Sequence, residues 1–224
     1  MKKNLIIAPH YDDEILGVGG TISKLKKKEE FYICIITNGS ISATKNIIRK
    51  NFLKKQNITK NIMKLTNIIK YFSLNLPATK LDQIALSSIS DSLIKVIKKV
   101  KPYKVYIPSN KDMHIDHRIT FEASLVALRP IYDQKIETVL SYEVLSETDW
   151  GSELGKKFSP NYYQKISKED LEFKIKLFKF YKSEVKKYPH PRSEKGIKNL
   201  ASIRGQYINC NYAEAFEVVK YINY

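Results

Sequence analysis

The fold is decided near the N-terminus by the stretch Asn4-Leu-Ile-Ile-Ala-Pro-His-Tyr-Asp-Asp-Glu14, which passes from apolar to acidic residues within a few positions. The apolar part, residues 4–9, has the length and composition of a strand that is buried on both faces of a sheet. The acidic residues that follow occupy the place where a helix dipole favours negative charge, so we expect a helix over residues 12–28. A buried strand that leads directly into a helix is typical of α/β proteins.

The same alternation continues along the chain. Apolar runs predict three further strands, at residues 31–37, 104–108 and 138–144. An apolar stripe over residues 89–100 predicts a helix, another helix is expected to begin near Arg118, and a long one is expected over residues 168–187. The pattern predicts an α/β fold with a mainly parallel sheet, and a length of 224 residues fits a single domain, residues 1–224.

Composition limits the kinds of protein that this chain can be. Its hydrophobic content of 43% and charged content of 28% are ordinary for a soluble globular protein. No apolar run approaches the ~20 residues that a membrane-spanning helix needs, and the first run is too short for a signal peptide, so we expect a cytoplasmic protein. Cys34 and Cys210 form no C-x-x-C pair, so the sequence predicts neither a cysteine zinc site nor a disulfide framework.

The net charge of +16 favours an anionic partner, which would be a nucleic acid, a membrane surface or an acidic small substrate. The lysines are spread along almost the whole chain, as is typical of solvated helix faces. No zinc-finger spacing or RNA-recognition motif accompanies them, so we expect no nucleic-acid partner.

Side chains able to carry chemistry gather after two of the expected strands. The first cluster is Pro9-His-Tyr-Asp-Asp-Glu14, and the second is Asp112-Met-His-Ile-Asp-His117; together they hold three of the four histidines. Ligands of α/β sheets bind outside the carboxyl ends of the strands, near the switch in strand order. We therefore expect the two clusters to meet there and to form a split metal site.

The metal ligands expected from the spacing are His10, Asp13 and His117. His10 and Asp13 are three positions apart, so that one helical turn can bring them to the same side, and His117 comes from the second cluster. Three protein ligands leave positions open for water and substrate, which distinguishes a catalytic zinc site from a structural one. Two histidines and one carboxylate also suit ferrous iron.

The remaining residues of the two clusters have expected roles beside the metal. Asp12 cannot readily share the metal with its neighbour and is better placed as the base that takes a proton from water. His114 would stabilise an oxyanion or protonate a leaving amine, and Asp116 would hydrogen-bond a histidine ring and fix its tautomer. Either cluster alone has a structural explanation, but their joint occurrence after two different strands favours a metal site.

The motifs also resemble those of a known family. Pro9-His-Tyr-Asp-Asp-Glu14 resembles the PHPDDE signature of the PIG-L/LmbE-like zinc deacetylases, and His114-Ile-Asp-His117 resembles their HPDH motif. Further similar segments include Ile35-Ile-Thr-Asn-Gly39, Pro189-His-Pro-Arg-Ser193 and Tyr212-Ala-Glu-Ala-Phe216. The resemblance implies a Rossmann-like fold with helices on both faces of the sheet, a zinc ion, and removal of the acetyl group from an N-acetylated amino sugar of the N-acetylglucosamine type.

The resemblance also assigns roles to residues. It implies metal ligation by His10, Asp13 and His117, a general base at Asp12, and a histidine that stabilises the transition state at His114. Tyr11 and Ile115 stand where the family has prolines, and neither position is a ligand. The family often has an Arg-x-x-Glu pair after the second strand; here Arg49 or Lys54 would stand in for the arginine, and no matching glutamate follows.

Several residues are candidates for contacts with the substrate: Arg49, Asn110, Tyr142, Glu143, His190 and Arg192. Tyr142 and Glu143, at the end of the fourth strand, would bind hydroxyls or else pack and pair structurally. His190 and Arg192 would form a cationic rim for a phosphate or carboxylate, or else a solvated turn. The expected substrate is a small, anionic N-acetylated sugar, linked to a nucleotide or a lipid. A lipid-linked substrate would bring peripheral membrane contact, and the composition leaves room for a homo-oligomer.

Two other functions stay open at this point. One is an amide hydrolase with the same metal site that acts on a non-sugar acylated amine or a thiol conjugate. The other is a non-catalytic anion-binding protein in which the metal is structural.

Overall fold

The computed structural model describes residues 1–39, 45–131, 135–155 and 157–224, and for residues 45–52 it describes the backbone alone. In chain order the elements are β1 (Lys2–Ala8), α1 (Asp13–Leu25), β2 (Glu29–Thr37), α2 (Lys45–Leu65), β3 (Ile68–Leu76), η1 (Leu81–Gln83), α3 (Leu86–Val100), β4 (Lys104–Pro108), α4 (Ile115–Ala127), β5 (Thr138–Tyr142), η2 (Trp150–Leu154), β6 (Tyr162–Ile166), α5 (Lys168–Phe178), α6 (Glu194–Gln206) and β7 (Tyr212–Tyr221).

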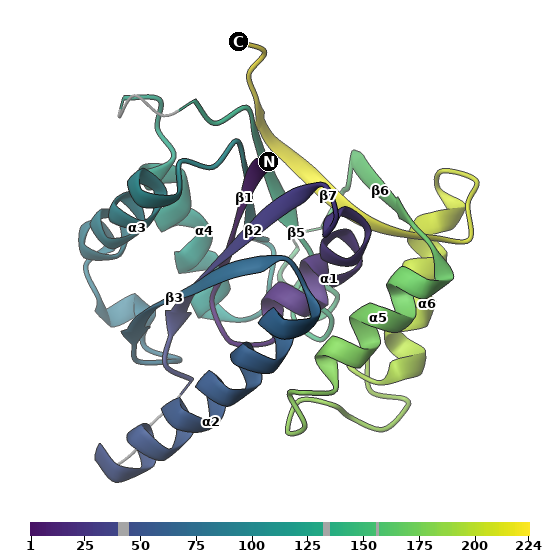
Figure 1. Ribbon diagram of the computed structural model, residues 1–224, viewed down its shortest axis with the longest axis horizontal. Helices are drawn as coiled ribbons and strands as arrows, with labels where there is room; N and C mark the ends of the chain where they lie inside the picture. Colours follow the sequence, from purple (N-terminus) through teal and green to yellow (C-terminus); the bar gives the residue numbers. More distant parts are fainter. Residues whose placement is uncertain (40–44, 132–134, 156) are drawn as a thin grey trace.

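The described strands form one sheet in the order β3-β2-β1-β4-β5-β7-β6. Neighbouring strands from β3 to β5 are parallel, whereas β7 runs antiparallel to both β5 and β6 (Figure 1). The prediction of an α/β fold with a mainly parallel sheet is confirmed. After β3 the chain returns to the other side of β1, so the strand order switches between β1 and β4.

Helices cover both faces of the sheet (Figure 1). On one face α1, α5 and α6 pack with the end of α2 over a core that includes Ile6 and Ala8 of β1. On the other face α3 and α4 pack over a core that includes Leu5 and Ile7 of the same strand. These four side chains have no exposed surface. The apolar run at residues 4–9 is thus explained by a central strand that is buried on both sides.

Three strands, two whole helices and the ends of two further helices differ from the sequence-based expectation. No bounds were predicted for α2 and α6. Strands β3, β6 and β7 were not predicted, and two of them, β3 and β6, lie at the edges of the sheet. Helix α4 begins at Ile115, earlier than Arg118, because the ring of His114 accepts a hydrogen bond from the Asp116 amide and caps the helix. As a result, both Asp116 and His117 lie in the first turn of a helix.

The helix expected over residues 168–187 is shorter than predicted. Helix α5 ends at Phe178, and the chain turns so that Tyr181 points inward. The Tyr181 hydroxyl donates a hydrogen bond of 2.5 Å to Glu14 Oε1, 167 positions away. A buried tertiary hydrogen bond therefore overrides the local helical pattern, and it ties this turn to the start of α1.

Within the described ranges, no helix combines the length and the apolar character that crossing a membrane requires.

Candidate metal centre

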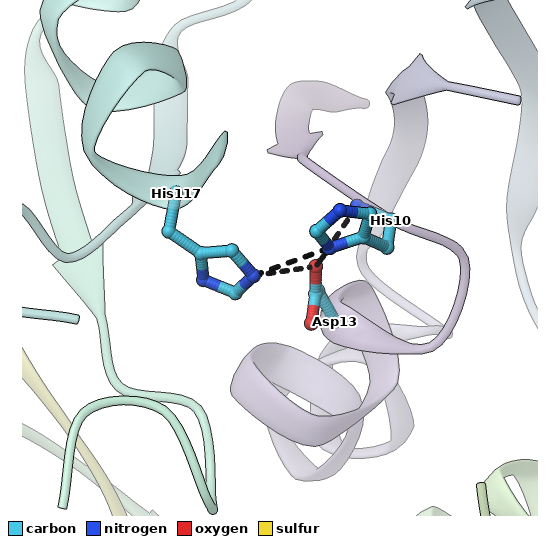
Figure 2. Close-up of side chains that lie close together, drawn as sticks. All are labelled: His10, Asp13 and His117. Atoms are coloured by element: carbon cyan, nitrogen blue, oxygen red, sulfur yellow. Dashed lines mark hydrogen bonds and ion pairs between the residues drawn. The ribbon is translucent and has the colours of Figure 1, made fainter. Parts of the chain in front are cut away.

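The two polar clusters meet at the carboxyl edge of the sheet, beside the switch in strand order. His10 follows the end of β1, and Asp13 begins α1. His117 comes from the first turn of α4, which follows β4, the strand next to β1. Figure 2 shows His117 reaching from α4 towards His10 and Asp13 at the start of α1. The register of β1 and β4 thus brings together residues 107 positions apart.

Three potential ligand atoms converge at this point. Nδ1 of His10 and Nε2 of His117 are 3.3 Å apart, and each lies 3.3 Å from Oδ2 of Asp13. Ligand atoms around a tetrahedral zinc ion, with bonds of ~2.0–2.1 Å, are separated by about the same distance. The residues present therefore fit a single divalent ion.

A second property of Asp13 supports the fit. Oδ2, the oxygen that faces the two histidines, accepts the His10 amide at 2.9 Å, whereas the second oxygen, Oδ1, is buried and has no hydrogen-bond partner among the described residues. Buried carboxylate oxygens are rarely left without a partner, and an unsatisfied one is an indication of an ion or another group. His10, His114 and Asp116 also cluster. However, His10 Nε2 and His114 Nδ1 already take part in hydrogen bonds with Asp116. The set of His10, Asp13 and His117 is therefore the better site.

Each of the two histidines has a carboxylate partner on its other ring nitrogen. His10 Nε2 lies 3.0 Å from Asp116 Oδ2, and His117 Nδ1 lies 2.6 Å from Asp112 Oδ2. Asp116 also accepts the amide of Thr79, and Asp112 accepts the Thr148 hydroxyl. Such partners fix the tautomer that presents a lone pair to the metal.

Asp112 is a candidate site residue that the sequence analysis did not assign. It lies five positions before His117, outside the helix, so helical spacing does not link the two. The only signal was its place in the second polar cluster. Its side chain is fully buried, which for a carboxylate requires partners of this kind.

The electrostatics of the centre favour positive charge. Burial alone would lower the pKa of His117, but the carboxylates of Asp13 and Asp112 raise it well above its usual value. Burial alone would raise the pKa of Asp13, but the two histidines hold it well below its usual range. A divalent cation would supply such positive charge between these groups.

Asp12 is held beside the centre in a strained backbone conformation. Its φ angle is 108°, a region that residues with a side chain rarely adopt. The Asp12 amide donates to Glu14 Oε2 at 2.9 Å, and Glu14 is itself buried. Burial and the neighbouring Asp13 raise the pKa of Asp12 well above its usual value, whereas Arg192 acts in the opposite direction.

Arg192 does not form the exposed rim that the sequence suggested. Its guanidinium donates to Asp12 Oδ2 at 3.1 Å, to Glu147 Oε1 at 3.1 Å and to Glu184 Oε2 at 3.4 Å. The side chain is only 13% exposed. His190 lies half-buried next to it, where its Nδ1 accepts the Arg192 amide at 3.1 Å. Arg192 therefore contacts the expected base, 180 positions away in the chain.

The other candidates for substrate contacts lie in different surroundings. Tyr142 is fully buried, its hydroxyl donates to the Ile7 carbonyl, and its ring leaves no room for a side chain at Gly17. Glu143 pairs with Arg204 at 2.6 Å. These contacts favour the structural alternative for both residues.

The last candidates lie in the turn after β4 and in helix α2. Asn110 is half-buried in the turn after β4, close in sequence to the second cluster. The side chain of Arg49 lies outside the described residues. Lys54 is exposed, whereas Lys55 turns inward, with its ammonium 4.6 Å from the centroid of the Tyr11 ring. Lys55 was not singled out in the sequence.

The chain is similar to known proteins over most of its length. It is 27% identical over 184 residues to YaiS, an uncharacterised deacetylase of Escherichia coli (strain K12), with 80% of this chain and 90% of that protein covered. It is 24% identical over 229 residues to the diacetylchitobiose deacetylase of Thermococcus kodakarensis, with 98% of this chain and 84% of that protein covered.

A solved structure and a family match complete the comparison. The N,N'-diacetylchitobiose deacetylase of Pyrococcus horikoshii has a TM-score of 0.76 at 22% identity, over 97% of this chain and 84% of that chain, which shows a shared fold. Residues 5–128, more than half of the chain, match the PIG-L family, GlcNAc-PI de-N-acetylase. The chain therefore belongs to the PIG-L family.

Proposed function

We propose that this protein is a metal-dependent N-deacetylase that removes the acetyl group from an N-acetylated amino sugar. The observation that carries the proposal is the open set of three ligand atoms, 3.3 Å apart, with the carboxylate of Asp12 adjacent to it. Relatives that are named as deacetylases of an N-acetylated disaccharide support the choice of substrate class.

In this proposal His10, Asp13 and His117 hold a zinc ion. When bound, zinc lowers the pKa of water and polarises a carbonyl oxygen. Asp12 takes a proton from the attacking water, whose oxygen forms a bond to the acetamide carbon. The bond between that carbon and the sugar nitrogen then breaks, the nitrogen receives a proton, and acetate and a free amine leave the site.

His114 is suited to stabilise the oxyanion that forms on the acetamide oxygen. Burial lowers its pKa to about 4, so the ring is neutral near pH 7. Its Nδ1 accepts the Asp116 amide at 3.1 Å, which leaves the proton on Nε2. A neutral ring with a fixed N–H group is a hydrogen-bond donor that needs little reorganisation during the reaction.

The proposal is tested by measuring acetate release from neutral N-acetylated sugars, nucleotide-linked sugars and acylated amines that are not sugars. Asp12→Asn should keep the metal and lower kcat by a factor of about 10²–10⁴, the usual contribution of a general base. Glu153→Gln, an exposed carboxylate on η2, serves as the matched control.

Two outcomes would replace the proposal. Release of acid only from acylated amines that are not sugars would favour the non-sugar hydrolase. A protein that binds metal but releases no acetate from any compound, with Asp12→Asn indistinguishable from the wild type, would favour the non-catalytic alternative. Metal analysis of protein purified without added metal would distinguish zinc from ferrous iron.

A further inference from the structure

Asp12 precedes helix α1 as its N-cap residue, but its side chain does not cap the helix. An aspartate at this position usually accepts an amide of the first turn with its carboxylate. Here the Asp12 carbonyl accepts the amides of Ile15 and Leu16, at 3.0 Å and 2.9 Å, and the carboxylate accepts from the guanidinium of Arg192. In this conformation, with a φ angle of 108°, the carboxylate lies beside the metal centre and does not serve the helix.

The strained conformation of Asp12 is held by Glu14, two positions further along the chain. The Asp12 amide donates to Glu14 Oε2 at 2.9 Å, and the Glu14 side chain is fully buried. In a capping box the third residue of a helix reaches back to the N-cap amide, whereas Glu14 makes this contact from the second position. Strained backbone conformations persist only where the surrounding structure determines them. Glu14 is the group that does so for the Asp12 amide.

The other oxygen of Glu14 is held by two tyrosines from distant segments. Tyr181, in the turn after α5, donates its hydroxyl to Oε1 at 2.5 Å, and Tyr71 of β3 donates to the same atom at 3.3 Å. Helix α5 packs beside α1, which brings Tyr181 to Glu14 (Figure 1). A buried oxygen that lost these donors would be left unsatisfied, which is costly. Both ends of the Glu14 carboxyl group are therefore fixed.

These contacts form a continuous chain from the two hydroxyls to the expected base. Without the hydroxyls, the carboxyl group of Glu14 is free to turn away from the Asp12 amide. Without that acceptor, the backbone of Asp12 relaxes towards a common φ angle, and its carboxylate moves with it. Glu14, Tyr71 and Tyr181 are not among the candidate metal ligands, so the metal should be retained.

We propose that Glu14, Tyr71 and Tyr181 are positioning residues, which hold the Asp12 carboxylate where it reaches the attacking water. This proposal rests on the proposed function, because it concerns the base of that reaction. The three side chains act through the Asp12 backbone and do not touch the substrate.

The test compares two double variants of the full-length, metal-loaded protein. Y71F/Y181F removes both hydroxyls that contact Glu14 and keeps the rings. The control Y32F/Y163F removes two half-buried hydroxyls that donate elsewhere, to Glu30 and to the Pro160 carbonyl, both at 3.1 Å. With N,N'-diacetylchitobiose as substrate, Y71F/Y181F should lower kcat about 10-fold, since a displaced base loses part of its contribution, and should leave KM and metal content unchanged.

The control should change kcat less than about 2-fold, because its hydroxyls lie outside the chain of contacts to Asp12. Equal losses in the two variants, or a loss that appears in KM or in metal content, would overturn the proposal. If Y71F/Y181F does not fold, Y181F alone removes the shorter hydrogen bond and is compared with Y163F in the same way.

A double-mutant cycle distinguishes positioning of the base from a general effect on the fold. In an Asp12→Asn background there is no base left to position, so Y71F/Y181F should lower the residual kcat less than about 2-fold further. A further loss of about 10-fold in that background would mean that the hydroxyls act by another route, and would contradict the proposal.

Crystal structures of the zinc-loaded wild type and of Y71F/Y181F need no turnover. We expect the wild type to keep the positive φ angle of Asp12, and the variant to lose the hydrogen bond from the Asp12 amide to Glu14, with a displaced Asp12 carboxylate. This result supports the positioning role even if no acetylated sugar is hydrolysed, which would count against the proposed function alone. An Asp12 that stays in place in the variant would overturn the positioning role, whatever the activity.

Discussion

The metal centre and the surface pocket between helix α2 and edge strand β3, which Tyr11 helps to line, are built in opposite ways. The centre is buried and rich in carboxylates, and its histidines are held by Asp112 and Asp116. The pocket is open, carries lysines at its rim and has no carboxylate in its lining. The contrast indicates that the groups able to carry chemistry are held in fixed positions by buried partners, whereas the lining of the pocket is largely exposed.

This contrast predicts where a substitution acts. A change at the metal centre should lower metal content or kcat for every substrate, because the chemical step depends on it. A change in the pocket, whose lining includes none of the three ligand candidates, should leave metal content unchanged. The following variants test that division, and they are ordered by the size of the expected effect.

The largest effect is expected for His117→Ala. The variant should lose its metal, and its kcat should be more than about 100-fold below that of the wild type. Loss of a residue that only orients a ligand costs up to about 100-fold, so loss of a ligand should cost more. His190→Ala is the matched control, because His190 lies outside the ligand set. Metal content by elemental analysis and acetate release are the measurements. If His117→Ala retained its metal, His117 would not be a ligand.

A smaller effect is expected for Asp112→Asn. The amide oxygen can still accept a hydrogen bond from His117 Nδ1, but the negative charge is lost, so metal affinity should fall about 10-fold. Competition with a chelator measures this affinity. Asp82→Asn, an exposed aspartate in η1, provides the control. If the affinity of Asp112→Asn equals that of the control, the carboxylate does not orient the ligand.

The smallest effect, and the sharpest test of the contrast, is expected for Arg192→Gln. Arg192 is a cation that belongs to the metal centre, since it contacts Asp12. Displacement of the base should lower kcat by about 10-fold for neutral and phosphate-bearing substrates alike, with metal content unchanged. Arg204→Gln removes a similarly half-buried arginine, paired with Glu143, away from Asp12.

The outcome for Arg192 distinguishes two roles for this residue, contact with the substrate and contact with Asp12. An increase in KM confined to the phosphate-bearing substrate would return Arg192 to the role of a cationic rim, which the sequence suggested. An equal loss of kcat on both substrates would show that Arg192 acts through its contact with Asp12.

The α/β class, the first strand and the polar clusters were predictable because each depends on residues close together in the chain. The burial of residues 4–8 in β1 and the acidic start of α1 are both visible in the short stretch from residue 4 to residue 14. The edge strand β3 was missed because its pattern is half-exposed, and α5 was predicted too long because the hydrogen bond from Tyr181 to Glu14 is not a local signal.

What the sequence determined by itself is the chemical content of the site: two histidines and a carboxylate of types that hold a metal, a second carboxylate beside them, and a long segment without acids. What only the tertiary structure decided is the set of partners, such as Asp112 for His117 and Arg192 for Asp12. The physical reason is that residue type and periodicity are local properties. A contact across 180 positions, in contrast, depends on the path of the whole chain around the sheet.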